Sequence, residues 1–239
     1  MNALRLKPRV AACTRILSLT SLALASFAGM PAMASTFRLQ STTVIMDESD
    51  RRTSFNVENT GGEPILLLSK LSDLDDKDFA KSILVTPAVT RIDPGQSQLV
   101  NFALKKGVSL DREYLLKASF EGVTQKAKGG TRMPIRQEIG FIAQPKSMPA
   151  DATPWKALNV RVEGNQITLA NPSKRVVRLG PAIRLQPSGV EIPLAHAYIM
   201  PGQSMSATAE GAAAATQITI TPLSRYGLVQ ATATLDVSR

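Results

Sequence analysis

The chain has 239 residues and a formal net charge of +9, and it contains a single histidine and a single cysteine. One histidine, His196, excludes histidine-rich metal sites and argues against a Ser-His-Asp triad. The sequence has no glycine-rich phosphate loop and no zinc-binding spacing. We therefore expect no catalytic residues, no metal site, no cofactor and no enzymatic activity.

The N-terminal segment has the pattern of a signal peptide. Its cations are Arg5, Lys7, Arg9 and Arg15. An apolar run over 16–30 follows, and then Ala32, Met33 and Ala34 form the small-x-small pattern that signal peptidase cuts. We expect export and cleavage after Ala34. A membrane anchor is the weaker alternative, because the run falls short of the roughly 20 residues that a span needs.

The remaining residues, 35–239, suit one large or two ordinary domains. Removing the four leader cations leaves 24 Lys and Arg against 19 Asp and Glu, a net charge of +5. The only cysteine, Cys13, lies in the leader, so we expect no disulfide in the rest of the chain. A mild surplus of positive charge is typical of a solvated surface, and no second long apolar run occurs. We expect a soluble exported protein with no nucleic-acid partner and no membrane insertion.

Short apolar alternation bounded by turn residues, the pattern of half-buried strands, runs through the first half. The predicted strands are 37–45, 55–57, 65–68, 83–85, 89–92, 100–104, 114–120 and 133–143. An acidic loop is predicted over 72–81; it lacks the central glycine and terminal glutamate of a calcium loop, which favours a solvated loop. About seven strands in this length predict an immunoglobulin-like sandwich.

The segment 144–154 carries three prolines and little apolar sequence, so we interpret it as a linker. We place an N-terminal domain at 35–146 and a smaller C-terminal sandwich at 147–239. The predicted strands of the second domain are 158–162, 167–170, 176–179, 183–185, 218–220 and 227–237. The alanines over 212–215 predict a loop or a helical turn. The predicted fold is all-β, with two immunoglobulin-like β-sandwich domains.

Several stretches, in this order, carry a resemblance to a known family. They are Thr42 to Ile45, Asn59, Val85 to Pro87, Arg91 to Gly95, Leu110 to Glu113, Ile139 to Pro145, Asn171-Pro172, Met200 to Gly202, and Tyr226-Gly227. Together the stretches resemble the PapD-like periplasmic chaperones of chaperone–usher pilus assembly. The resemblance spans nearly all of 35–239. It implies a periplasmic protein that binds pilin or fimbrial subunits and delivers them to an outer-membrane usher.

The resemblance also implies a mechanism. A chaperone of this family lends the last strand of its first domain to a subunit whose own sandwich is incomplete, a form of β-strand addition. The donor positions of the family fall on Thr131, Met133 and Ile135. Thr131 is a weak donor, because a hydroxyl fills an apolar pocket poorly. The alternative is that Met133 and Ile135 simply cover the core of their own domain.

The chain departs from the family at the residues that hold the terminal carboxylate of a bound subunit. The family uses an arginine on the first strand and a lysine on the last, and here the corresponding residues are Thr43 and Gly140. Candidate substitutes for these anchors are Arg136, Arg132, Arg38 and Lys117. Arg136 lies nearest to the donor segment, and charge-assisted pairing is the chemistry that such a site requires. The alternative, that all four are solvated surface charges, stays open.

A second departure concerns the ion network between the two domains of the family. Its glutamate, arginine and acidic positions correspond here to Glu113, Gln144 and Arg225. The cation has thus moved to the other side of the junction. We predict an interdomain ion pair between Glu113 and Arg225.

Two functions from different classes follow. The first is a periplasmic chaperone that caps subunits by donor-strand complementation. The second is an exported β-sandwich that is itself a structural or surface-fibre component without chaperone activity. A cysteine pair or an N-terminal donor extension would favour the second function, and the sequence shows neither. A periplasmic hydrolase is disfavoured by the missing nucleophile and base, and self-association through the exposed strand, as a self-capping dimer, is left open.

Overall fold

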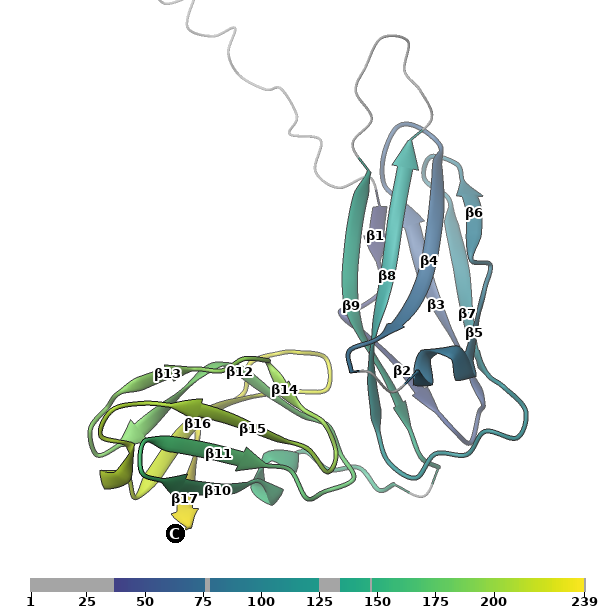
Figure 1. Ribbon diagram of the computed structural model, residues 1–239. Helices are drawn as coiled ribbons and strands as arrows, with labels where there is room; N and C mark the ends of the chain where they lie inside the picture. The colour runs from purple at the N-terminus through teal and green to yellow at the C-terminus, as the bar shows by residue number, and fades with distance from the viewer. Residues whose placement is uncertain (1–36, 76–77, 125–133, 147, 239) are drawn as a thin grey trace, which may run out of the picture. The chain divides into compact units, whose positions relative to one another are not determined.

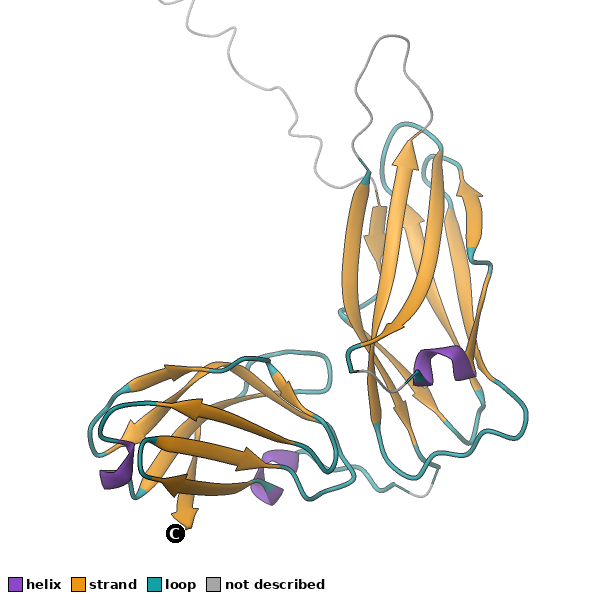
Figure 2. Ribbon diagram, viewed as in Figure 1, coloured by secondary structure: helices purple, strands orange, loops and turns teal. Residues whose placement is uncertain are grey.

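The computed structural model describes residues 37–75, 78–124, 134–146 and 148–238, and their regular secondary structure is almost entirely strand (Figures 1 and 2). The predicted leader and the predicted site residues Thr131, Arg132 and Met133 lie outside the described residues. Residues 35–239 form one compact unit. Within the described part of the chain, no helix combines the length and hydrophobicity that a membrane crossing requires.

The first sandwich consists of two sheets, as the alternation predicts. One sheet has the order β1 (Phe37–Leu39), β3 (Arg52–Asn59), β7 (Ser97–Leu104), β5 (Ile83–Thr86). The other has the order β2 (Thr43–Asp47), β9 (Ile135–Gln144), β8 (Tyr114–Thr124), β4 (Ile65–Asp73), β6 (Val89–Ile92). A short 3-10 helix, η2 (Phe79–Ser82), follows β4. Neighbouring strands are antiparallel except β2 and β9, which run parallel.

Period-two burial builds the core between these sheets. In β7, Val100, Phe102 and Leu104 are buried while Leu99 is exposed. The ring centroids of Phe102 and Phe141 are 5.0 Å apart, within the range of favourable aromatic contacts. The alternating residues of the sequence therefore line a single apolar core.

The second sandwich has a separate core that includes Trp155. Its sheet order is β13 (Glu191–Pro193), β12 (Val177–Gln186), β16 (Gln217–Leu223), β17 (Ala233–Ser238), β10 (Asn159–Glu163), β11 (Gln166–Ala170), β15 (Ser204–Thr208), and β14 (Tyr198–Ile199) pairs with β12. Two short 3-10 helices, η3 (Pro154–Ala157) and η4 (Ala212–Ala214), complete it. The prediction of an all-β protein with two immunoglobulin-like domains is confirmed.

Some predicted strands differ from the structure. The two strands predicted over 176–185 are one strand, β12, with an irregularity between Leu179 and Ile183. The strand predicted over 227–237 begins only at Ala233: Gly227 lies in a turn with a φ of 77°, and Val229 forms only an isolated bridge with Leu223. The sequence does not predict β15, since its segment SMSAT has one large apolar side chain and therefore little alternation.

Two buried asparagines occupy equivalent positions in the two sandwiches. Asn59 donates to the carbonyls of Glu63 (2.8 Å) and Ile92 (2.9 Å). Asn171 donates to the carbonyls of Arg175 (2.7 Å) and Ile199 (3.0 Å). The side chain of each asparagine thus ties a loop to a neighbouring strand, and the same arrangement occurs once in each sandwich.

We expect Asn59→Ala and Asn171→Ala each to lower the free energy of unfolding by about 2–3 kcal/mol, because each change leaves buried carbonyls without donors. Urea denaturation measures the difference. Asn165, exposed in a turn, provides the control Asn165→Ala, which should change stability by less than about 0.5 kcal/mol. Equal losses in all three variants would contradict the assigned role.

Glu48 is buried and holds two other segments of the first sandwich. Its carboxylate accepts hydrogen bonds from the backbone N–H groups of Leu110 (3.0 Å) and Lys146 (3.2 Å). Burial acts to raise the pKa of Glu48, but these hydrogen bonds outweigh it, so the pKa lies below its ordinary value. The ionised form of Glu48 is therefore favoured by the folded state.

A lowered pKa gives stability that is present above the ordinary glutamate pKa of about 4.3 and is lost as the pH falls through the folded-state value. We expect Glu48→Gln to destabilise the protein by about 1–2 kcal/mol at pH 7. The difference from the parent should shrink near pH 3. Urea unfolding at both pH values, with the exposed Glu63→Gln as control, checks this; a difference that stays constant with pH would contradict it.

Candidate functional site

The strand β9 has an edge that is only partly covered. Residues Ile135 to Ala143 pair with β8, whereas β2 pairs only with the segment from Gly140 to Gln144. The segment before Gly140 therefore has β8 on one side and no described strand on the other. The side-chain amide of Gln137 donates to the carbonyl of Phe37 at 2.9 Å. A strand edge of this kind accepts an added strand through its backbone groups.

Ile135 is the one predicted donor residue that the structure describes. Its side chain is half-buried and packs against the first core together with Ile139. Arg136 follows Ile135 in the strand, so its side chain lies on the opposite face, and it is exposed. Ile135 thus has contacts within its own domain and lies at the start of the open segment of β9.

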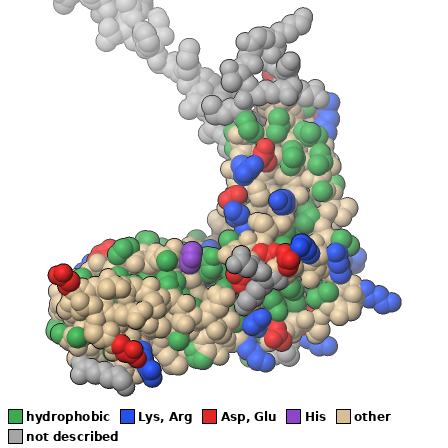
Figure 3. All heavy atoms as spheres, in the orientation of Figure 1, with side chains coloured by type: hydrophobic (Ala, Val, Ile, Leu, Met, Phe, Trp, Pro, Cys, Tyr) green, Lys and Arg blue, Asp and Glu red, His purple; other side chains and the backbone are tan. Residues whose placement is uncertain are grey.

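The described candidate anchors each have a carboxylate partner in the first sandwich. Arg38 pairs with Glu58, and Arg136 donates from Nε to Glu121 Oε2 at 2.8 Å. Lys117 Nζ lies 3.2 Å from Glu138 Oε2. Ion pairs as exposed as these contribute little energy. Figure 3 shows cationic and acidic side chains mixed on the visible face, as expected for a solvated surface.

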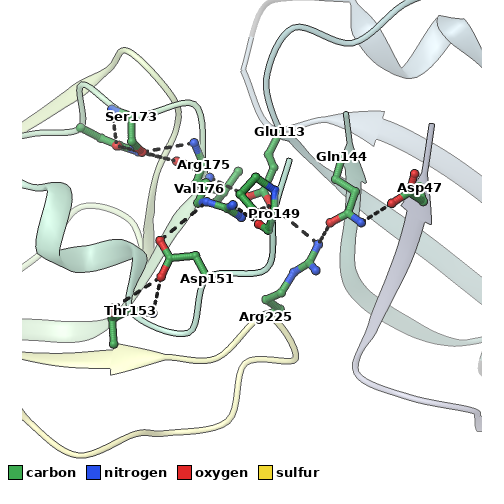
Figure 4. Close-up of polar contacts among 11 residues, drawn as sticks. Asp47, Glu113, Gln144, Pro149, Asp151, Thr153, Ser173, Arg175, Val176 and Arg225 are labelled. Carbon is green, nitrogen blue, oxygen red and sulfur yellow. Dashed lines mark hydrogen bonds and ion pairs between the residues drawn. The ribbon is translucent and has the colours of Figure 1, made fainter. Parts of the chain in front are cut away.

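Glu113 lies at the centre of a buried polar network (Figure 4). Its side chain is only 5% exposed, and it accepts a hydrogen bond of 2.9 Å from the backbone N–H of Val176. Its Oε1 atom lies 3.7 Å from Arg175 Nη1 and 3.7 Å from Arg225 Nη2. The predicted partners Glu113 and Arg225 are therefore within ion-pair distance, and Arg175 is a second cation that the sequence did not indicate.

The network continues on both sides of Glu113. Arg225 Nη2 donates to Gln144 Oε1 at 2.6 Å, and Gln144 Nε2 donates to Asp47 Oδ2 at 2.5 Å. On the other side, Arg175 Nε lies 3.7 Å from Asp151 Oδ2. The side-chain amide of Gln144 thus connects a cation, Arg225, to a carboxylate, Asp47, through one hydrogen bond to each. The residues involved come from β2, β9 and both sides of the linker.

The pKa of Asp47 is lowered by its own turn and, to a smaller extent, by this network. The Ser49 hydroxyl donates to Asp47 Oδ1 at 2.7 Å, and this hydrogen bond is the main cause that places the pKa of Asp47 below its ordinary value. Burial opposes the effect, and Gln144 adds to it. Asp47 therefore presents a stable acceptor to Gln144.

Within the described ranges, no group of three or more His, Cys, Asp and Glu residues is arranged to hold an ion. His196 stacks against Tyr198, with ring centroids 5.4 Å apart.

Comparison with known proteins identifies the family. Residues 36–149 match the pili and flagellar-assembly chaperone family, PapD N-terminal domain. The fimbrial chaperone YhcA of Escherichia coli K12, described as uncharacterized, is 33% identical over 190 residues, which cover 79% of this chain and 84% of YhcA. This chain belongs to the PapD-like pilus-assembly chaperones. The prediction of the family and of its place in chaperone–usher assembly is confirmed, and the family implies the periplasm.

Solved structures agree with the fold of this chaperone. The Salmonella enterica SafB chaperone, in its complex with the SafA pilin, has a TM-score of 0.70 at 19% identity, covering 86% of this chain and 98% of that one. The Pseudomonas aeruginosa CupB2 chaperone has a TM-score of 0.67 at 20% identity, covering 84% of this chain and 100% of that one.

The chaperone has a cation at the junction that none of the sequence predictions included. Arg178, on β12, donates from Nη1 to Thr43 Oγ1 at 3.0 Å and to the carbonyl of Arg225 at 2.8 Å. Thr43 and Gly140, which the resemblance places at the two basic anchor positions of the family, are direct neighbours across β2 and β9. No sequence signal connects Arg178 to them, because it lies in the other sandwich.

Proposed function

We propose that this chaperone captures pilin or fimbrial subunits in the periplasm through the open edge of β9 and delivers them to an outer-membrane usher. In this role it is a binding protein, not an enzyme. The observation that carries the proposal is the segment of β9 before Gly140, which β8 pairs on one side while β2 covers only the residues after it.

Strand addition at this edge would combine two sources of affinity. The backbone groups of β9 would form a ladder with the subunit, and alternate side chains would fill its pockets. Thr131, Met133 and Ile135 are the proposed donors, with Met133 and Ile135 supplying most of the apolar area. SafB, a structural neighbour of this chaperone, has been solved bound to the SafA pilin, which supports a pilin as the partner.

Two further proposals accompany this function. Cleavage after Ala34 would release the periplasmic form from its leader. The Glu113 and Arg225 pair would hold the two sandwiches in the arrangement that binding requires, since separating them would leave Glu113 as an uncompensated buried charge.

The test is co-purification from periplasm. The tagged chaperone is expressed with the pilin subunits encoded beside it, in parallel with a Met133→Glu, Ile135→Glu double variant. We expect a one-to-one complex with the parent and none with the variant. Failure of both proteins to recover any pilin would overturn the proposal and favour a structural or surface-fibre component. Secretion of pilins to the cell surface, lost when the chaperone gene is deleted, tests delivery to the usher.

A further inference from the structure

The open edge of β9 ends at a defined place. Because β2 takes over this edge from Gly140 onward, a strand added before Gly140 cannot continue past it. A strand that runs parallel to β9, as β2 does, would have its carboxyl terminus at this point. The residues around Gly140 therefore determine what the end of such a strand meets.

Three residues form a row across the sheet at this level. Thr43 pairs with Gly140, and Gly140 pairs with Lys117 of β8. Directly opposed residues project from the same face of a sheet. Since Gly140 has no side chain, the space between Thr43 and Lys117 is open. The guanidinium of Arg178 reaches into it, because a Cβ atom on Gly140 would lie 3.6 Å from Arg178 Nη1.

The backbone around Arg178 also makes room for this cation. A Cβ atom on Gly227 would lie 3.1 Å from Arg178 Nη2, and Gly227 has a φ of 77°, which favours glycine. Two glycines from different sandwiches thus flank one guanidinium. At Gly227, where a Cβ atom would crowd the guanidinium, glycine permits the close approach, whereas at Gly140 a Cβ atom would make ordinary contact.

Among the described residues, the hydrogen-bond partners of Arg178 are neutral. Its two hydrogen bonds, to the Thr43 hydroxyl and the Arg225 carbonyl, both use Nη1. Among the residues that the structure describes, no carboxylate lies within 4.0 Å of its nitrogens. Burial lowers the pKa of the Arg178 guanidinium. A half-buried guanidinium with five N–H donors and no counter-ion is well suited to a carboxylate, which it binds with two parallel hydrogen bonds.

A cleft of about 180 Å³ opens beside this cation. Its lining includes Lys117, Gly140 and Arg178, with the apolar residues Leu74 and Leu115. Glu138 also lines it and pairs with Lys117 at 3.2 Å, both side chains being about 40% exposed. An ion pair of this exposure is weak, so an incoming carboxylate can share Lys117.

We propose that Arg178, with Lys117, forms a carboxylate site over Gly140 that holds the terminal carboxylate of the bound pilin. The proposal rests on the proposed function, and it deepens it. The first sandwich has lost both basic anchors of its family, and the second sandwich supplies one from β12. Thr43 then becomes a hydrogen-bond acceptor that positions the guanidinium.

The first test needs the chaperone alone. Acetate is titrated into the chaperone while the side-chain Nε resonance of Arg178 is followed by NMR, with acetamide as the uncharged control. We expect a saturable shift with acetate only, and no acetate-dependent change at the Lys117 resonances in Arg178→Gln. The control variant is Arg184→Gln, an exposed arginine on the same strand that pairs with Glu191. No saturable shift with acetate would overturn the site.

The second test uses a synthetic peptide of the final strand of the co-purified pilin, made as the free acid and as the amide. We expect amidation to weaken binding to the parent about tenfold to a hundredfold, as loss of a charged hydrogen-bonded pair does. In Arg178→Gln, the preference for the acid should fall to less than about threefold, because only the exposed Lys117 remains. Gly140→Lys in that background should restore the preference for the acid, because the backbone there accepts a side chain.

The outcomes separate the site from the function. If amidation lowers the affinity of the parent and of Arg178→Gln by the same factor, Arg178 only connects Thr43 and Arg225. The carboxylate site is then overturned while the function stands. If acetate binds at Arg178 but neither form of the peptide binds, the anion site stands and the proposed function fails.

Discussion

Glutamate in place of Ile135 is expected to abolish capture of a pilin while the chaperone still folds. Burying an isoleucine side chain contributes about 1.5–3 kcal/mol, and a charge in an apolar pocket adds a further cost. We expect the affinity to fall more than about a hundredfold, which corresponds to roughly 3 kcal/mol. Titration of the pilin peptide, followed by calorimetry, measures the loss.

Two controls accompany this variant. Val89→Glu introduces the same charge at an exposed position, 54% accessible, on β6 at the other edge of the same sheet. It should leave affinity unchanged. Because Ile135 also contacts the first core, the thermal unfolding of the Ile135→Glu variant must be compared with that of the parent. Equal loss of binding in both glutamate variants would place the pilin elsewhere than on β9.

Removal of the Glu113 carboxylate is expected to destabilise the junction strongly. Glu113→Ala would leave Arg175 and Arg225 without their common anion and the buried N–H of Val176 without an acceptor. Breaking a buried ion pair from one side costs about 3–5 kcal/mol. Trp155, the only tryptophan and a member of the second core, reports unfolding by fluorescence in urea.

Two comparisons make the result specific. Glu113→Gln keeps an acceptor for the N–H of Val176, so it should lower the free energy of unfolding less than Glu113→Ala does. Arg225→Glu places two carboxylates together and should loosen the junction, visible as a change in small-angle scattering. Unchanged stability in Glu113→Ala, or unchanged scattering in Arg225→Glu, would contradict a role for the pair.

The alternation of apolar residues predicted most strands of the first sandwich. The phase of 133–143 was correct for its described part, where Ile139, Phe141 and Ala143 face the core. Strands without strong alternation, such as β15, were missed because their burial depends on neighbours that are distant in the chain. The structure leaves the roles of the donor residues as a prediction, since Thr131 and Met133 lie outside the described residues.

The amino-acid sequence was sufficient for the family and the all-β fold. Through the resemblance it also predicts that Thr43 and Gly140 stand at the basic anchor positions of the family. It also indicated Glu113 and Arg225 as partners, through positions shared with the family. It did not indicate Arg175 or Arg178. The physical reason is that the side-chain pattern of a strand is local, with a period of two residues. Which cation reaches a given gap depends on how distant strands come together, and only the tertiary structure brought Arg178 of β12 to the space above Gly140.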